Sequence, residues 1–165
     1  MSTYCLHILL VGCALYAISK AYPTGAPQET CKIFTASHTG HTAQNSQSTY
    51  TITASPSTVA SGGTITVTLQ GNGEPFKGFF IQGQDKNSKK PVGKFLKQSE
   101  AQTRDCSGTG SQDAATHVNA NNKSKILLQW QAPSDYKGTV VFRSVVVKTY
   151  ELFWNNVYSS PITVA

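Results

Sequence analysis

Alternation of apolar and polar residues is the main pattern along this chain, and it predicts short β-strands. Between two glycine-rich turns, Ile65, Val67 and Leu69 alternate with threonines, so their apolar side chains fall on one face of a strand. No window offers apolar residues at helical spacing, and an all-β fold is therefore expected. The pattern predicts about seven or eight strands, at residues 50–54, 64–69, 76–82, 93–97, 115–119, 126–130, 139–150 and 161–164.

The connections between these strands are predicted from turn residues and from the loss of periodicity. Residues 85–88 predict a turn into the next strand, and residues 98–113 show no period, which indicates a surface loop. A two-asparagine turn favours pairing of the strands at 115–119 and 126–130. All-β chains with turns at this spacing are usually sandwiches or barrels, and Trp130 in the middle of a strand favours the core of an antiparallel sandwich.

Composition agrees with a β-rich domain. The chain has 165 residues, enough for one ordinary domain. Charged residues make up 13%, against a usual fraction of about 25%, and the polar share is carried by Ser, Thr, Asn, Gln and 13 Gly. Aromatic residues, at 10%, supply bulky core side chains, which argues against a disordered chain.

The start of the chain has the features of a secretory signal peptide. Residues 6–18 are mostly apolar, but this segment is too short to span a bilayer, which takes about 20 residues. Small residues at the first and third positions before the cut fit cleavage after Ala21, with cleavage after Ala17 as an alternative. We therefore expect a signal peptide at 1–21 and a secreted single domain at 22–165 that does not insert into membranes.

Cleavage would leave two cysteines, Cys31 and Cys106. In a secreted domain, two cysteines most simply form one structural disulfide. Their wide separation is unlike the close Cys-x-x-Cys spacing of redox and metal-binding pairs. A disulfide that closes a loop of this length stabilises the fold by roughly 4.5 kcal/mol in the chain-entropy description.

The charge is modestly basic and unevenly distributed. Loss of Lys20 with the signal leaves 13 basic and 8 acidic residues, a net charge of +5, which is too sparse for a nucleic-acid binder. Six lysines lie close together in the sequence and would form a basic patch that attracts anionic ligands. In the alternative interpretation they only solvate a hairpin loop and protect a sheet edge from aggregation. The six are Lys77, Lys86, Lys89, Lys90, Lys94 and Lys97, opposed in that stretch only by Asp85.

No pattern of catalytic residues stands out. A Gly-x-Ser-x-Gly motif is absent, and the acidic residues are scattered, with no pair suited to glycoside hydrolysis. His38 and His41 form a His-x-x-His pair and His117 is the other histidine after the signal, but a zinc site would need a further carboxylate ligand. We therefore expect no enzyme activity, no bound metal and no cofactor.

Two surface features remain as candidate sites. Asn122 begins an Asn-Lys-Ser sequon in a predicted turn, which is the exposed setting that N-glycosylation requires. Exposed aromatic rings would bind sugars by stacking, although core packing suits Phe153 and Trp154 better. The aromatic candidates are Tyr136, Tyr150, Phe153, Trp154 and Tyr158.

Short motifs are spread over nearly the whole chain after the signal: YPTGAP at 22–27, FKGFFIQG at 76–83, GKF at 93–95, TH at 116–117, WQAP at 130–133, GTVVF at 138–142 and FW at 153–154, with Cys31 and Cys106 between them. In order and spacing, these motifs resemble the reeler domain family. The resemblance implies an immunoglobulin-like sandwich, release into haemolymph and a role in innate immunity. Single-domain chains of this length resemble the insect defence proteins of the family, including nodulation-related members. One departure is that residues 32–38 lack the Met and Pro often found before the histidine.

Three functions are therefore considered. The main hypothesis is a secreted, monomeric immune protein that binds microbial cell-surface glycolipids, such as lipopolysaccharide, or polysaccharides through the basic patch. Such binding should be salt-sensitive, because exposed charges are screened within about 8 Å at physiological ionic strength. The first alternative is a host-side interaction module that binds haemocytes or matrix. The second alternative is a direct antibacterial effector, which would need an amphipathic cationic surface able to enter lipid.

Overall fold

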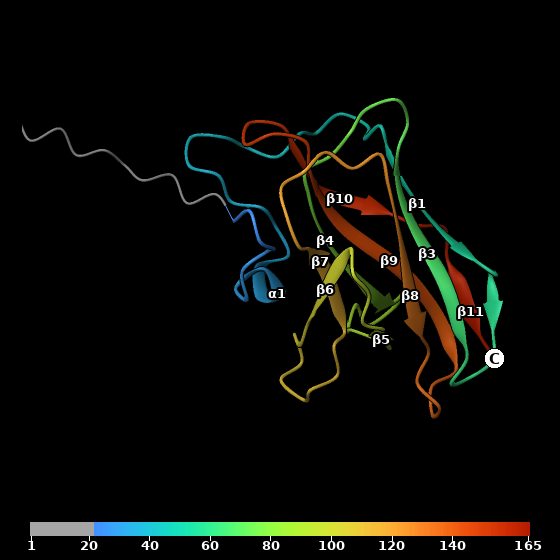
Figure 1. Ribbon diagram of the computed structural model, residues 1–165. Coiled ribbons are helices and arrows are strands. Elements are labelled where there is room, and N and C mark those ends of the chain that lie inside the picture. The colour runs from blue at the N-terminus through green and yellow to red at the C-terminus, as the bar shows by residue number, and fades with distance from the viewer. Residues whose placement is uncertain (1–21) are drawn as a thin grey trace, which may run out of the picture.

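The computed structural model describes residues 22–165, and the predicted signal peptide at 1–21 lies outside the described residues (Figure 1). Within residues 22–165 the chain forms a β-sandwich with a single helical turn, which confirms the all-β prediction. The elements are α1 (Thr30–Ile33), β1 (Tyr50–Ser55), β2 (Thr58–Val59), β3 (Thr64–Gly71), β4 (Gly78–Asp85), β5 (Lys94–Phe95), β6 (Ala101–Arg104), β7 (Ala114–His117), β8 (Lys125–Gln131), β9 (Gly138–Val147), β10 (Phe153–Tyr158) and β11 (Ile162–Val164).

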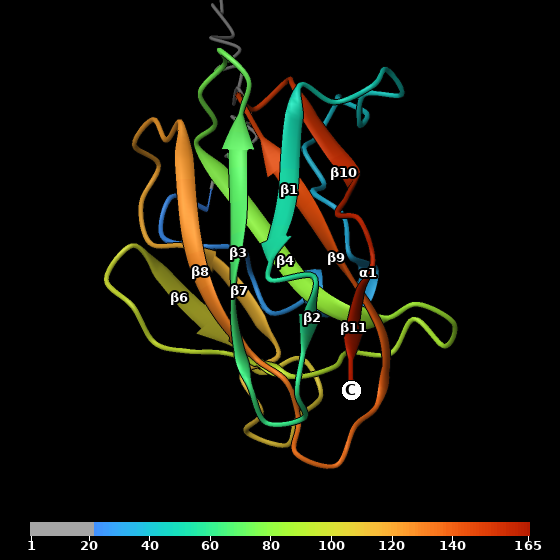
Figure 2. The ribbon, with the colours of Figure 1, turned by 90° about the vertical axis from the view of Figure 1, so that its right-hand side faces the viewer.

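The strands form two sheets that stack face to face (Figure 2). The smaller sheet has the order β1-β3-β8-β5. The larger sheet has the order β2-β11-β9-β4-β7-β6, with β10 also pairing β9. All pairs between these strands are antiparallel except β11 with β2, which is parallel and departs from the expectation of a purely antiparallel sandwich.

The main core lies between the sheets and is centred on Trp130. The Trp130 side chain is fully buried, and its Nε1 donates a hydrogen bond of 3.1 Å to the carbonyl of Val92. Its ring meets the ring of Phe142 edge-on, with ring centres 5.3 Å apart. The position predicted for Trp130 from the sequence, in the middle of a core strand, is therefore confirmed.

The two sheets differ in how their outer faces are covered. In β8 of the smaller sheet, buried and exposed residues alternate, because one face meets the core and the other meets water. In β4 of the larger sheet nearly every residue is buried. The segment before β1 packs on the outer face of this strand, where Phe34 contacts Phe80 at a ring-centre distance of 5.2 Å. Figure 1 shows α1 on this side of the larger sheet.

A disulfide holds this N-terminal segment, residues 22–49, in place on the larger sheet; it is also called the covering segment below. Cys31 in α1 is bonded to Cys106 in the β6–β7 connection, as predicted. Beside it, the Gln28 side chain donates a hydrogen bond of 2.7 Å to the carbonyl of Asp105. The Asp105 carboxylate in turn accepts backbone N–H groups from the following loop, such as that of Gly110 at 2.6 Å. These bonds lower the pKa of Asp105, so the carboxylate stays charged and keeps the loop folded.

Some connections predicted from the sequence are wrong. Residues 98–113 are not only a loop, because β6 lies within them and pairs with β7. The segments 115–119 and 126–130 do not form a hairpin, since β7 joins the larger sheet and β8 the smaller one. The described residues contain eleven strands rather than seven or eight, the additional ones being β2, β6 and β10.

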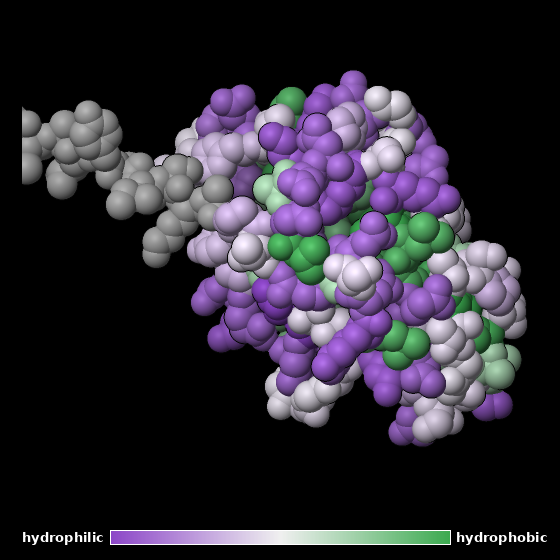
Figure 3. Space-filling model, viewed as in Figure 1, coloured by the Kyte–Doolittle hydropathy of each residue, from purple (hydrophilic) through white to green (hydrophobic). Residues whose placement is uncertain are grey.

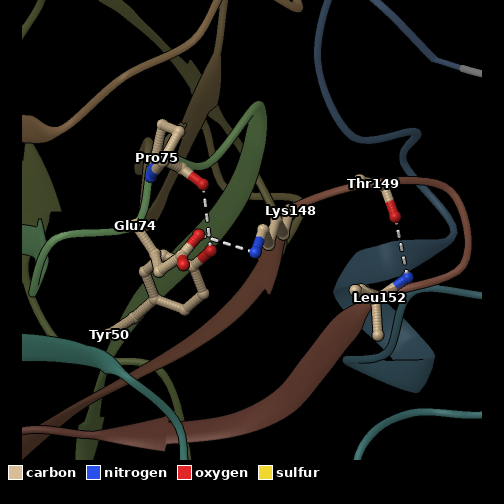
Figure 4. A network of polar contacts seen from close by, with 6 residues as sticks. All are labelled: Tyr50, Glu74, Pro75, Lys148, Thr149 and Leu152. Atoms are coloured by element: carbon tan, nitrogen blue, oxygen red, sulfur yellow. Dashed lines mark hydrogen bonds and ion pairs between the residues drawn. The ribbon is translucent and has the colours of Figure 1, made fainter.

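A polar network joins β1, the β3–β4 connection and the end of β9 (Figure 4). Lys148 Nζ lies 2.6 Å from Glu74 Oε2, and the Tyr50 hydroxyl donates a hydrogen bond of 3.0 Å to the carbonyl of Pro75. Burial and the nearby Glu74 carboxylate raise the pKa of Tyr50, which keeps its hydroxyl protonated as a donor. Within residues 22–165, Lys148 and Glu74 form the only ion pair.

Candidate functional site

An apolar pocket of about 480 Å³ lies between the N-terminal segment and the outer face of the larger sheet. Its volume is in the range of about 300–1,000 Å³ that is typical of ligand pockets. The sheet contributes Phe79, Phe80 and Val145, and the N-terminal segment contributes Pro27 and Ile33. The pocket exists because this segment crosses the sheet and is fixed to it by the disulfide.

His117, at the end of β7, joins the two walls of this pocket. Its Nε2 lies 3.1 Å from the carbonyl of Tyr22, and the backbone N–H of Phe79 donates to its Nδ1 at 3.2 Å. A neutral ring protonated at Nε2 satisfies both contacts. Burial lowers the pKa of His117, with smaller contributions from the charges of Lys123 and Arg104, and this favours the neutral ring.

The rim of the apolar pocket carries both charge and aromatic groups. Lys77, which is exposed, and Glu29 lie among the residues that line it. At another part of the rim the rings of His38 and Tyr150 are stacked with their centres 4.5 Å apart, and His38 Nδ1 lies 2.5 Å from the Tyr150 carbonyl. The pocket therefore combines an apolar interior with a mixed polar rim.

The six lysines singled out in the sequence do not form one continuous patch. Lys77 precedes β4 and Lys86 follows it, and the extended strand between them separates the two residues by roughly 30 Å. Lys94 lies in β5 at the edge of the smaller sheet, with Lys97 just beyond it. The group that stays together, here named the turn lysines, consists of Lys86, Lys89 and Lys90 in the β4–β5 connection.

The turn that carries these lysines is well ordered. Asp85 Oδ1 accepts the backbone N–H groups of Asn87 at 3.0 Å and Ser88 at 2.7 Å. Lys89 has a left-handed backbone, with φ of 60°, and its Nζ donates to the Lys86 carbonyl at 2.7 Å. The turn lysines are exposed, and none of them lies in an ion pair within residues 22–165. Their charge is therefore available to an anionic ligand.

The three histidines of residues 22–165 lie in two places. His38 and His41 face each other across an isolated bridge on the N-terminal segment, and His117 belongs to the pocket wall. No group of three or more His, Cys, Asp or Glu side chains in the described residues could hold a metal ion.

The glycosylation sequon and the aromatic candidates occupy different surroundings. Asn122 is exposed in the β7–β8 connection, where an oligosaccharide could be attached. Phe153 is buried and Trp154 packs on Tyr50, as expected from core packing. Tyr158, in contrast, is 53% exposed.

Most residues of the apolar pocket were not predicted as functional from the sequence. They come mainly from the N-terminal segment, β4, β7 and β9, and the apolar ones from the strands resemble ordinary core residues in the sequence. Only the extra layer on the larger sheet brings them together. The surface seen in Figure 3 is otherwise mostly hydrophilic, with its apolar residues in separate small patches.

Comparison with known proteins gives one consistent family. The family model described as "Reeler domain" matches residues 29–165. The chain is 38% identical over 164 residues to "Putative defense protein 3" of Antheraea mylitta, covering 96% of this chain and 95% of that protein. Among solved structures, the human F-spondin reeler domain superposes with a TM-score of 0.62 at 17% identity, covering 77% of this chain and 96% of that one.

A second kind of relative contains a similar region within a longer protein. "Putative ferric-chelate reductase 1 homolog" of Drosophila melanogaster is 32% identical over 152 residues, which cover 88% of this chain but only 23% of that protein. The likeness is thus confined to a minor part of the reductase relative. In residues 22–165 no helix is both long enough and apolar enough to cross a bilayer.

Proposed function

The chain belongs to the reeler domain family, and from this premise we propose that it is a secreted defence protein that binds anionic glycolipids or polysaccharides on microbial surfaces. The defence role is supported by a relative of nearly the same length that carries a defence name. Binding, rather than catalysis, is the proposed activity. The protein is proposed to act as a monomer in an extracellular fluid such as haemolymph, without a cofactor.

The observation that carries the proposed binding is the group of turn lysines. Three ammonium groups on one ordered turn, without carboxylate partners, form a local positive surface. Phosphate and carboxylate groups of a microbial surface would pair with them as point charges. Because the lysines are exposed, salt should weaken this attraction.

The apolar pocket adds a second element to the proposal. An acyl chain of a glycolipid would fit its apolar interior, and each buried methylene contributes about 0.8 kcal/mol. Lys77 at the rim would then lie near the anionic head group. A polysaccharide without an acyl chain would use the turn lysines alone.

The proposal is tested by sedimentation of the oxidised protein, from Tyr22 onward, with intact Gram-negative bacteria, Gram-positive bacteria and yeast. The wild type is compared with the triple variant Lys86→Gln, Lys89→Gln, Lys90→Gln at low and physiological salt. A control of equal charge, Lys94→Gln, Lys97→Gln, Lys125→Gln, changes the side of the smaller sheet instead. Salt-sensitive binding that is lost only in the turn variant supports the proposal.

Other outcomes separate the alternatives. Equal loss in both triple variants contradicts a site at the turn lysines. If the wild type binds no microbial cell but coats haemocytes, the host-side module replaces the proposed function. Release of dye from anionic vesicles by the wild type would instead favour a membrane-disrupting effector.

A further inference from the structure

A second pocket, of about 350 Å³, lies on the outer face of the larger sheet beside the covering segment. Gln82 of β4 pairs with Arg143 of β9, and Arg143 pairs with Tyr158 of β10. Cross-strand partners point to the same face of a sheet, so these three side chains form a row along one side of the pocket. Lys32 and Lys89 line it from the covering segment and from the β4–β5 turn.

Two residues that line this pocket carry buried hydrogen-bond donors without acceptors. Gln82 is only 2% exposed, and its Oε1 accepts a bond of 3.0 Å from Gln84 Nε2. Its own Nε2 has no partner, and neither has Arg143 Nε. Of the three buried side-chain nitrogens without a partner in residues 22–165, two therefore belong to neighbouring residues of one pocket. Buried donors are nearly always paired in folded proteins, so such a pair indicates a missing acceptor.

The charged residues that line this pocket are all basic. Lys32, Lys89 and Arg143 line it, and no Asp or Glu is among its lining residues. The Arg143 side chain is held in position, because its Nη2 donates 2.9 Å to Asn156 Oδ1 and its guanidinium lies 4.2 Å from the ring centre of Phe34. A planar, oriented guanidinium is the group best suited to bind an oxyanion.

One wall of the pocket offers a surface for a sugar ring. Tyr158, the one aromatic side chain of this row, is exposed, and its hydroxyl donates a hydrogen bond of 3.3 Å to Asn156 Oδ1. Pro91, also exposed, contributes a further apolar edge. A flat ring with one apolar face and a polar tip suits a ligand that is partly apolar and partly hydroxylated.

We infer that this pocket binds an acidic sugar, with the oxyanion at Gln82 and Arg143 and the sugar ring against Tyr158. The oxyanion is a carboxylate of a uronic acid or a phosphate ester of a sugar, which share this chemistry. The inference rests on the proposed function and deepens it, since it assigns one acidic residue of a microbial glycan or glycolipid to a defined site. Lys32 and Lys89 attract the anion without fixing its orientation.

Calorimetric titration tests the inference with four probes: glucuronate, glucose 6-phosphate, neutral glucose and inorganic phosphate. At least one of the two acidic sugars should bind at least tenfold more tightly than glucose and than phosphate. The stronger of the two identifies the source of the oxyanion. Equal affinity for inorganic phosphate and glucose 6-phosphate, with no binding of glucuronate, overturns the assignment of a sugar site, as does the absence of binding by all four probes.

Single substitutions that should leave the fold intact test whether the acidic sugar binds at this pocket. Gln82→Glu keeps the shape of the side chain and the acceptor for Gln84, but places a carboxylate beside Arg143. It should lower acidic-sugar affinity more than tenfold, while the thermal midpoint stays equal or rises. Lys89→Gln should weaken binding severalfold, whereas Lys90→Gln, its neighbour outside the pocket, should have little effect. Wild-type affinity in Gln82→Glu, or equal effects of the two lysine variants, contradicts the inference.

The same variants separate this inference from the proposed function. If Gln82→Glu loses the acidic sugar and the wild type still fails to sediment with any cell, the pocket is confirmed and the microbial role is wrong. If wild-type protein binds cells through the turn lysines and Gln82→Glu binds them equally, the pocket assignment is wrong and the proposed function stands.

Discussion

The hydroxyl of Tyr136, in the β8–β9 connection, donates a hydrogen bond of 2.6 Å to Oδ2 of Asp85 at the end of β4. This bond joins the turn that carries the turn lysines to the β8–β9 connection beside it, at the same end of the sandwich. Together with the bonds from Ser88, it lowers the pKa of Asp85 to about 2. Burial and the Asp85 carboxylate raise the pKa of Tyr136 to about 12.

Replacement of Tyr136 by Phe should raise the pKa of Asp85. The value should remain below the ordinary 3.8, because the N–H groups of Ser88 and Asn87 still bond the carboxylate. A carboxyl whose pKa is lowered by folding adds stability above its unfolded pKa, and that stability is lost as the pH falls from about 4 to about 2. Carbon NMR titration of the Asp85 carboxyl measures the change, and an unaltered pKa in the variant would show that the Tyr136 bond is not formed in solution.

Removal of the disulfide should weaken the covering segment more than the sandwich. The double variant Cys31→Ser, Cys106→Ser is expected to lose about 2–4 kcal/mol of unfolding free energy in urea titrations. Hydrogen exchange should then increase first at Phe34 and other residues of the covering segment, while the amides around Trp130 stay protected. Uniform loss of protection in both layers would contradict an independent covering layer.

Substitution of Gly93 should damage the core. This glycine has φ of 70°, and a Cβ there would lie 2.3 Å from Cζ2 of Trp130. Gly93→Ala therefore combines a strained backbone with overpacking, at a cost of roughly 2–5 kcal/mol. Gly108→Ala is the matched control, since Gly108 has φ of 75° but nothing within 4 Å of its added Cβ, and it should cost only about 1–2 kcal/mol. Equal losses of urea stability in the two variants would exclude contact with Trp130 as the cause.

The stability of the wild type should fall as the pH drops below about 6.5. His117 has a lowered pKa in the folded protein because it is buried, so the unfolded chain binds a proton more readily. By linkage, the stability contributed by a group with a lowered folded pKa is complete above its unfolded pKa and is lost as the pH falls toward its folded pKa. Thermal midpoints between pH 5 and 7.5 should slope less in His117→Gln than in the wild type. Equal slopes in His117→Gln and the wild type would contradict a contribution from the buried ring.

Much of the fold could be predicted from the sequence, because one face of the smaller sheet is exposed to water and the other is buried. In strands such as β3 and β8, buried side chains alternate with more exposed ones, and this alternation requires only that one face of the sheet is buried. The strand β6 was missed because its residues are polar and it is held by backbone pairing with β7. The assignment of 115–119 and 126–130 to one hairpin failed because neighbours in sequence had separated into different sheets.

The candidate site was less predictable than the fold. The cysteine pair could be predicted by counting, since only Cys31 and Cys106 lie outside the predicted signal peptide. The six lysines are exposed. They were expected to form one patch because they lie close together in the sequence, but the extended strand β4 separates Lys77 from Lys86. Gln82 and Arg143 could not be recognised as candidate site residues from the sequence. Their proposed role depends on the pairing of their strands and on buried donors without acceptors, which only the structure shows.

The position of β11 in the larger sheet sets the order in which parts of this protein fold. Thr163 pairs with Thr58 in β2 and with Thr139 in β9, so the strand lies between two segments made much earlier. During synthesis, the edges of β2 and β9 that pair with β11 remain unpaired until residues 162–164 have left the ribosome. Pairing across such long stretches of chain is slow, and open strand edges invite association with other chains. The sandwich can therefore be completed only after residues 162–164 have been synthesised, and a chain cut short before Ile162 should leave these edges of β2 and β9 open to association.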